Sequence, residues 1–214
     1  MSVIPAKKWL FRIIHIDNLE YILRYGIFNR YHPNADPNYI NIGDSNLIEQ
    51  RNNHQVGISP PGGELGEYIP FYFGPLSPML YNIKTGHRGI TKRPQTDIVY
   101  LCCKINDLVG SCGDWCFTDG HAKTAISEFY NSLDNLEKVD WEVVTQKWWN
   151  NTEDDFDRMR RKQAEFLVKN HVPVSTIGII VVHDTERETQ VNNMLKQLGL
   201  NIPVLVNPKK EFYY

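Results

Sequence analysis

Glu165 is the acidic residue whose surroundings most favour chemistry. It lies in the run RKQAEFLV, where basic and polar residues give way to apolar ones. A carboxylate at the mouth of an apolar strand must be paired with a cation or must face a cleft. Two interpretations follow from the local sequence: a salt bridge to the neighbouring Arg161 or Lys162, or a carboxylate that meets a substrate.

Two arginines have settings that suit an anion. Arg12 interrupts the apolar run WLFRII, so its guanidinium needs a phosphate or another anion, a set of carbonyl groups, or a buried ion-pair partner. Arg51 ends the segment DSNLIEQR, where a cation also gains from the dipole of a short helix. A structural role for Arg51 therefore stands beside a role in binding.

Histidines and basic clusters provide the remaining polar candidates. His15 in IIHIDNL and His121 in FTDGHA each lie near a turn, where a histidine more often makes a local hydrogen bond than takes part in catalysis. The basic segments at residues 87–94 and 158–162 are typical of solvated faces, and contact with phosphates is the functional alternative.

The cysteines do not predict a metal site. All four fall within 15 residues, and the adjacent Cys102 and Cys103 would point to opposite faces of a strand. Without a CxxC pair, we expect reduced, partly buried thiols and no metal. The sequence also lacks a GxGxxG fingerprint, a P-loop and an HExxH motif, so no single segment is a strong catalytic signature.

Length and composition restrict the class of protein. A chain of 214 residues with 42% hydrophobic and 22% charged residues suits one globular domain, residues 1–214. Aromatic residues make up 12%, enough to fill a core or to stack on bases and nicotinamide. The net charge of −2 argues against a non-specific duplex coater, although it permits an enzyme that grips a few nucleotides.

The N-terminal apolar run is cut by Arg12 and His15 too soon for a signal peptide. No stretch approaches the roughly 18 to 20 apolar residues that span a membrane. We therefore expect a cytoplasmic protein.

The first half of the chain must position Arg12, His15 and Arg51. We expect a strand at Trp9–Ile14, then a helix that Asp17 or Asn18 caps and Gly26 ends. Residues 29–40 suit a loop, residues 44–51 a short helix capped by Asp44 or Ser45, and residues 57–67 a turn-rich segment. Pro70 in the aromatic block YIPFYF should interrupt any regular central strand.

The second half alternates helices and buried strands. Strands are predicted at Asp97–Cys103, Ile177–Val182 and Val204–Val206. Asp119 suits the cap of a helix, residues 136–149 should be helical at their end, and RMRRK should be a basic helix before an apolar run. Residues 184–198 form an amphipathic helix whose inward residues are Val191, Met194, Leu195 and Leu198. The pattern is that of a mixed α+β domain.

Several segments form one pattern along almost the whole chain. In order they are RIIHIDNLEYIL, INIGDSNLIEQR, PPGGELGEYIPFYFGPLSPMLYNI, DIVYLCC, FTDGHA, VDWE, RKQAEFLV and EFYY. The pattern resembles the DarT family of DNA ADP-ribosyltransferase toxins, and most closely its thymidine-modifying branch. The resemblance implies the ADP-ribosyltransferase fold, with two small facing sheets, peripheral helices and NAD+ in the cleft. It also implies transfer of ADP-ribose to thymidine N3 in single-stranded DNA, with release of nicotinamide and a block to replication.

The resemblance also assigns residues. Glu165 matches the catalytic glutamate, whose carboxylate stabilises positive charge on the ribose. Arg51 matches a functional arginine that binds the pyrophosphate or helps remove a proton from the base. The other expected NAD+ contacts are Arg12, His15, Asn18, Gly43 and Tyr72. The expected DNA contacts are Met79, Leu80, His121 and Arg93. Some relatives have histidine at the position of Arg12.

A macrodomain antitoxin is the protein partner that this family implies. Three alternatives remain at this point. Guanosine is a second possible acceptor base. An enzyme of the same fold could act on protein or RNA, or only hydrolyse NAD+. A non-catalytic module that binds nucleic acid is the third.

Overall fold

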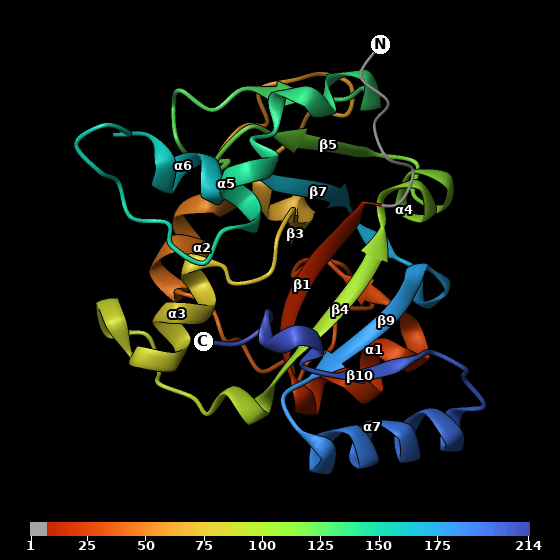
Figure 1. The fold of residues 1–214 in the computed structure, drawn as a ribbon. Coiled ribbons are helices and arrows are strands. Elements are labelled where there is room, and N and C mark those ends of the chain that lie inside the picture. Colours follow the sequence, from red (N-terminus) through yellow and green to blue (C-terminus); the bar gives the residue numbers. More distant parts are fainter. Residues whose placement is uncertain (1–7) are drawn as a thin grey trace.

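The computed structural model describes residues 8–214 (Figure 1). The strands are β1 (Trp9–His15), β2 (Ile27–Phe28), β3 (Tyr68–Tyr72), β4 (Ile98–Lys104), β5 (Trp115–Thr118), β6 (Phe129–Tyr130), β7 (Glu165–Lys169), β8 (His171–Val172), β9 (Ile177–Val182) and β10 (Val204–Val206). The helices are α1 (Leu19–Tyr25), α2 (Ser45–Asn52), α3 (Pro78–Thr85), α4 (Ile105–Ser111), α5 (Trp141–Thr145), α6 (Arg158–Lys162) and α7 (Thr185–Leu198). No helix among these residues is long and apolar enough to cross a membrane.

Eight strands join in the order β10-β9-β4-β1-β3-β7-β5-β6, and β2 pairs with β8 in a separate small sheet. β1 pairs with β4 at all seven of its residues, but with β3 only at Phe11 and Tyr72. The large sheet is therefore two four-stranded halves that meet at one residue pair. In Figure 1 the half with β5 and β7 crosses the view above the diagonal half with β1, β4 and β9.

Pro70 does not interrupt β3, which corrects one expectation. It pairs with Leu167 inside a regular antiparallel ladder to β7. The carbonyl of Pro70 instead accepts a hydrogen bond from the side chain of Arg12 in β1 (2.9 Å). The backbone N–H and C=O of one strand residue point to the same side. The backbone N–H that proline lacks would therefore point toward β1. Since β1 and β3 pair at only one position, its absence costs no hydrogen bond of the sheet.

Two helix expectations in the middle of the chain are also wrong. No helix follows Asp119, because its carboxylate accepts a hydrogen bond from the Glu128 amide (2.9 Å) and closes a loop. The helix expected at the end of residues 136–149 lies earlier, at α5. Nζ of the buried Lys162 donates hydrogen bonds to the carbonyls of Val144 (2.8 Å) and Gln146 (2.5 Å), on either side of the end of α5 at Thr145.

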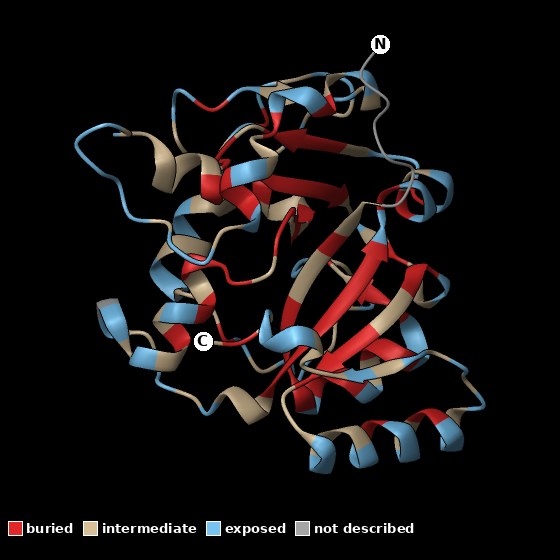
Figure 2. Ribbon diagram, viewed as in Figure 1, coloured by how far each residue is buried: buried red, intermediate tan, exposed pale blue. Residues whose placement is uncertain are grey.

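β4 and β7 are buried along nearly their whole length (Figure 2). Because successive strand residues point to opposite faces, the core lies on both faces of the sheet. Cys102 and Cys103 belong to different core clusters, which confirms that they point to opposite faces. All four cysteines are free thiols and buried; Cys112 is 7% exposed and the other three are 2% exposed or less. Burial raises the pKa of each thiol.

The termini of several elements follow from local sequence, as predicted. Gly26 ends α1 with a φ of 88°, which a residue with a side chain rarely adopts. The Asp44 side chain accepts a hydrogen bond from the Leu47 amide and caps α2. In α7, Val191 and Leu195 are buried, and Met194 and Leu198 pack against the same core.

Candidate active site

Glu165 and Arg51 form a bidentate ion pair at the start of the interior strand β7. Nη1 of Arg51 donates to Oε1 of Glu165 (2.8 Å), and Nη2 donates to Oε2 (2.6 Å). Glu165 is the first residue of β7 and is opposite Tyr72, the last residue of β3. The Ala122 amide donates to the same Oε1 (3.3 Å). α2, β3, β7 and the segment after β5 thus converge on one carboxylate that is 3% exposed.

The ion pair fixes the charges of the site. Burial raises the pKa of Glu165, but attraction to Arg51 and its hydrogen bonds outweigh burial and hold that pKa below the usual value. Burial lowers the pKa of Arg51, and attraction to Glu165 outweighs it, so this pKa is raised. Both side chains are charged at neutral pH.

His121 and Tyr72 are the neutral groups beside this pair. Burial lowers the pKa of His121, which favours the uncharged imidazole at neutral pH. Burial also raises the pKa of Tyr72, so its phenol keeps its proton. Its hydroxyl lies 3.9 Å from the Met79 sulfur in α3. The site therefore combines one carboxylate, one guanidinium, a neutral imidazole and a neutral phenol.

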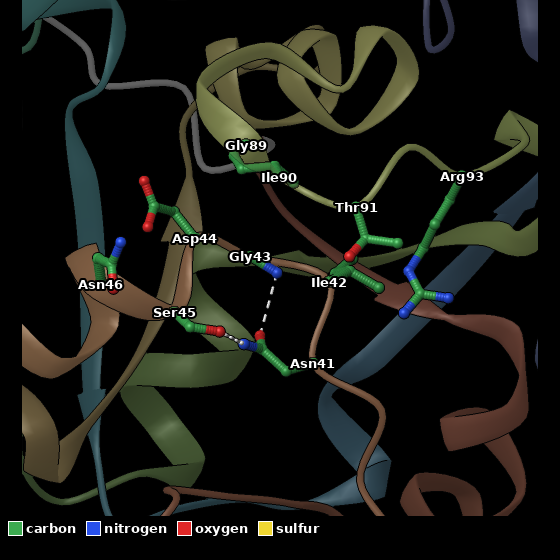
Figure 3. Close-up of a pocket in the computed structure, with 10 residues that line it drawn as sticks. All are labelled: Asn41, Ile42, Gly43, Asp44, Ser45, Asn46, Gly89, Ile90, Thr91 and Arg93. Atoms are coloured by element: carbon green, nitrogen blue, oxygen red, sulfur yellow. Dashed lines mark hydrogen bonds between the residues drawn. The ribbon is translucent and has the colours of Figure 1, made fainter.

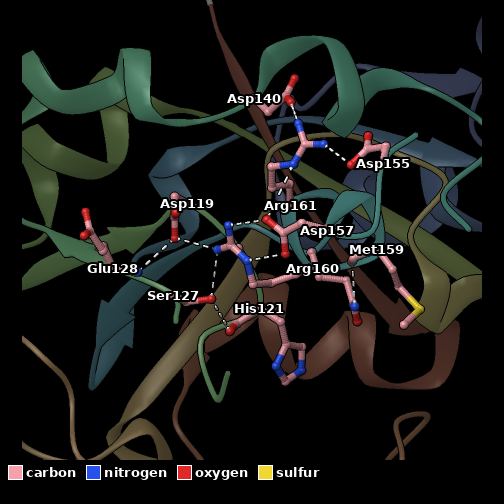
Figure 4. Close-up of polar contacts among 12 residues, drawn as sticks. Asp119, His121, Ser127, Glu128, Asp140, Asp155, Asp157, Met159, Arg160 and Arg161 are labelled. Carbon is pink, nitrogen blue, oxygen red and sulfur yellow. Dashed lines mark hydrogen bonds and ion pairs between the residues drawn. The ribbon is translucent and has the colours of Figure 1, made fainter. Parts of the chain in front are cut away.

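The basic helix α6 does not pair with Glu165, which corrects the local interpretation. Lys162 is 3% exposed and donates to the two carbonyls near the end of α5. Arg161 pairs with Asp140 and Asp155, and Arg160 pairs with Asp119 and Asp157 (Figure 4). Because aspartates already pair with Arg160 and Arg161, these two arginines are neither freely solvated nor available as phosphate ligands.

The entry strand contributes Arg12, which has spare hydrogen-bonding capacity. Its Nη1 donates to the Pro70 carbonyl, and its Nε is buried without a hydrogen-bond partner in the part of the chain that the structure describes. No carboxylate among residues 8–214 forms an ion pair with it. Of the three partners considered for Arg12, a carbonyl group is therefore present and a buried ion pair is not.

His15 and Asn18 are held by local contacts. Nδ1 of His15 accepts a hydrogen bond from the Asp17 amide (3.2 Å). Asn18 is 1% exposed, and its amide exchanges two hydrogen bonds with the Ile40 backbone (2.8 and 2.9 Å). Asn18 thus anchors the end of the 29–40 loop, and its side chain does not cap α1 as expected.

A pocket brings Gly43 and Arg93 together (Figure 3). The Gly43 amide donates to the Asn41 side chain (3.0 Å), which shapes the turn before α2. Arg93 borders the other side, and its Nε is buried without a partner among the described residues. The full lining is Asn41, Ile42, Gly43, Asp44, Ser45, Asn46, Gly89, Ile90, Thr91 and Arg93.

The expected DNA contacts are not equally placed. Met79 is partly exposed in α3, near Tyr72, and His121 lies near Glu165. Leu80 is 0% exposed and belongs to the core, so the expectation that its side chain faces DNA is wrong. The Ala122 amide is the group that sequence reasoning missed, because a sequence does not show which backbone N–H will be turned toward a carboxylate.

Comparison with known proteins identifies the family. The model of DarT, described as an ssDNA thymidine ADP-ribosyltransferase, matches residues 11–214. The chain belongs to the DarT family. A DNA ADP-ribosyl transferase of Escherichia coli O127:H6 is 36% identical over 203 residues, covering 95% of this chain and 93% of the relative. A DNA ADP-ribosyl transferase of Thermus sp. is 34% identical and covers 98% of both chains.

Solved DarT structures share the fold. DarT of Thermus sp. 2.9 in complex with ADP-ribosylated ssDNA matches with a TM-score of 0.87 at 32% identity, covering 98% of each chain. The same DarT in complex with NAD+ matches with a TM-score of 0.82 at 30% identity, covering 98% of this chain and 99% of that one. The predicted family and ADP-ribosyltransferase fold are confirmed. The predicted class, an NAD+-dependent DNA ADP-ribosyltransferase, is confirmed with them.

Among the described residues, no group of histidine, cysteine and acidic side chains is arranged to hold a metal ion.

Proposed function

We propose that this chain transfers ADP-ribose from NAD+ to N3 of thymidine in single-stranded DNA and releases nicotinamide. The observation that carries the proposal is the Arg51–Glu165 pair, which lies where β3 ends and β7 begins. The chain around it matches the DarT family from residue 11 to 214. Residues 1–214 act as one catalytic domain in this proposal.

Glu165 is the catalytic carboxylate. NAD+ supplies the ADP-ribosyl group: its ribose–nicotinamide bond breaks with the electron pair on nicotinamide, and thymidine N3 takes the ribose carbon as it loses its proton. Glu165 remains ionised because Arg51 and the Ala122 amide oppose its burial. A preorganised negative charge beside the ribose stabilises the positive charge that develops there.

Arg51 and His121 take different parts in handling the proton of N3. A guanidinium with a raised pKa is a poor proton acceptor, so Arg51 acts by charge and by its fork of donors. His121 is the neutral group near Glu165 with a ring nitrogen that can accept a proton. We assign the proton to His121 and stabilisation of the negative base to Arg51.

The remaining contacts follow from unsatisfied groups near the site. Arg12 and Arg93 each have a buried Nε without a partner among the described residues, which suits phosphate or ribose oxygens. Gly43 lies in the same pocket as Arg93, and Tyr72 ends β3 beside Glu165, where its ring can pack on nicotinamide. His15 and Asn18 shape the entry turn beside them, and Met79 offers an apolar contact to a base.

The biological setting completes the proposal. A Thermosipho africanus fusion of a DNA ADP-ribosyl transferase and a DNA ADP-ribosyl glycohydrolase is 26% identical over 209 residues, and this chain covers 49% of it. A partner that removes the adduct therefore suits this chain, and we propose a separate macrodomain antitoxin. The chain would act as a bacterial toxin in the cytoplasm, where it meets replicating DNA.

Mass analysis of single-stranded oligonucleotides incubated with NAD+ tests the proposal. One set contains thymidine, a second lacks it, and a third has N3-methylthymidine in its place. We expect adducts on the first set only, and Glu165→Gln should slow their formation by roughly 10² to 10³.

Other outcomes would overturn specific parts. An adduct on guanosine in the second set would overturn the choice of base. Nicotinamide release without any DNA adduct would overturn the DNA acceptor and favour protein, RNA or water. DNA binding without nicotinamide release would favour a non-catalytic module.

A further inference from the structure

The loop at residues 119–128 brings two groups to the catalytic carboxylate. It connects β5 to β6, and its Ala122 amide donates to Oε1 of Glu165 (3.3 Å). The adjacent His121 is close enough to Glu165 and Arg51 for their charges to act on its pKa. This 119–128 loop contains no regular helix or strand before β6, so something outside it must hold its shape.

Arg160 in α6 makes that external contact. Its Nε and Nη2 donate to the two oxygens of Asp157 (2.8 and 2.7 Å), which fixes the plane of the guanidinium. Its Nη1 then donates to Asp119 (2.9 Å) and to the Ser127 hydroxyl (3.2 Å), at the two ends of the 119–128 loop. Figure 4 shows this guanidinium between the three side chains.

The backbone of Arg160 holds the loop as well. Its carbonyl accepts a hydrogen bond from the His121 amide (3.0 Å), and the Ser127 hydroxyl donates to the His121 carbonyl (2.9 Å). Both backbone groups of His121 are therefore engaged. A side chain at Gly120 would collide with the Arg160 guanidinium, so the loop closes tightly around it.

We propose that Arg160 is a positioning residue for transfer to DNA, fixing the 119–128 loop so that His121 and the Ala122 amide stand in place beside Glu165. This inference rests on the proposed function. Arg160 is five residues before Glu165 and joins the loop to the strand that bears the carboxylate. Loss of the guanidinium should displace His121, which handles the proton of the acceptor base. Arg12 and Gly43, the residues assigned to NAD+, lie on other elements and should move less.

Arg161 offers a matched control on the same helix. Its guanidinium pairs with Asp140, Asp155 and Asp157, and none of these partners belongs to the 119–128 loop. Replacing either arginine by glutamine removes one charge and a similar set of ion pairs. Only the change at Arg160 removes contacts to the loop.

Hydrogen exchange of backbone amides tests the contact without relying on activity. We expect Arg160→Gln to speed exchange in the 119–128 loop, where the amides of His121 and Glu128 are hydrogen-bonded. Arg161→Gln should leave this loop protected. Unchanged exchange in the loop of Arg160→Gln would overturn the inference.

Activity then tests the consequence. A displacement of about 1 Å at a reacting group can cost about 10² in rate, so Arg160→Gln should lower adduct formation by about that factor. The ratio of nicotinamide released to ADP-ribose transferred should rise, while the affinity for NAD+ stays close to that of the parent. Arg160→Lys should not restore transfer, since an ammonium lacks the planar fork that spans Asp157 and Asp119.

If the Arg160 and Arg161 variants lose ADP-ribose transfer equally, and only in proportion to the decrease in their melting temperatures, Arg160 has a purely structural role. That result would overturn the inference. If Arg160→Gln does not fold, Ser127→Ala replaces it, because this change removes one hydroxyl between Arg160 and His121. Ser127→Ala should raise the ratio of nicotinamide released to ADP-ribose transferred, by less than Arg160→Gln would. An unchanged ratio in Ser127→Ala would also overturn the inference. If the parent protein forms no DNA adduct, the proposed function fails, while hydrogen exchange still decides whether Arg160 holds the loop.

Discussion

Replacing Arg51 with methionine should destabilise the protein through the carboxylate left behind. Glu165 is 3% exposed, and the side chain of Arg51 is 14% exposed. Removing one partner of a buried pair costs about 3 to 5 kcal/mol, because the remaining charge is uncompensated. The Ala122 amide still donates to Glu165, so we expect a loss near the lower end, about 3 kcal/mol at pH 7.

The dependence on pH separates this explanation from a simple loss of packing. In the parent protein the pKa of Glu165 lies below 4.5, so its contribution to stability is present at neutral pH and is lost only as pH falls below that value. In the variant, burial acts without Arg51 and raises this pKa. The folded variant then binds a proton more readily than its unfolded chain, and the difference in stability should narrow as pH falls from 7 toward 4.5.

Urea unfolding followed by tryptophan fluorescence measures these free energies for the parent, Arg51→Met, Glu165→Gln and the double variant. The double variant should lose less than the sum of the two single losses, since each single change leaves an unpaired group that the other removes. Additive losses, or a difference that stays constant between pH 7 and 4.5, would refute the reasoning.

Two further predictions concern buried contacts near the site. Burial lowers the pKa of Lys162 to about 8 from 10.5, so the folded protein holds this proton less tightly than the unfolded chain. As pH rises from 8 to 10.5, the free energy of unfolding of the parent should therefore increase by about 3 kcal/mol relative to that of Lys162→Met, measured by urea unfolding. A difference between the two unfolding free energies that stays constant over this pH range would exclude the effect. A methyl group at Gly74 would collide with the Val144 carbonyl, so Gly74→Ala should cost about 1 to 3 kcal/mol and lower the melting temperature. Gly110→Ala in α4, where no atom of residues 8–214 would lie within 4 Å of the added methyl group, is its control, and equal melting temperatures would contradict the prediction.

Local patterns predicted the outer elements well. β9 and β10 have the bounds that their apolar runs predicted, and α7 differs from its prediction by one residue at the start. Each of these depends on periodicity and on residues that are adjacent in sequence. The same applies to Gly26 and Asp44, whose effects on α1 and α2 extend over one turn.

Elements that depend on distant partners were predicted less well. Asp119 is a good helix cap by type, but Arg160, 41 residues later, takes its carboxylate. Pro70 fits in β3 because β1 hardly pairs with it there, and its carbonyl instead accepts a hydrogen bond from the side chain of Arg12, 58 residues earlier. Neither contact can be inferred from a window of neighbouring residues.

The site shows the same division. Glu165 and Arg51 were both identified as candidates, and the family resemblance gave them roles. Their contact spans 114 residues, and local sequence favoured Arg161 or Lys162 as the partner of Glu165 instead. Chemical type and resemblance thus identified the residues, whereas their pairing had to come from the fold.

The buried cysteines make the protein convenient for site-directed labelling. Because the four native thiols are buried and hold their protons more tightly than free cysteine, maleimides should react with them slowly while the protein stays folded. A cysteine introduced at an exposed position would then be the main reactive thiol, with no need to remove native ones. Paired fluorophores or spin labels, one in the 119–128 loop and one on α7, could follow movement of the loop when NAD+ or an oligonucleotide is added.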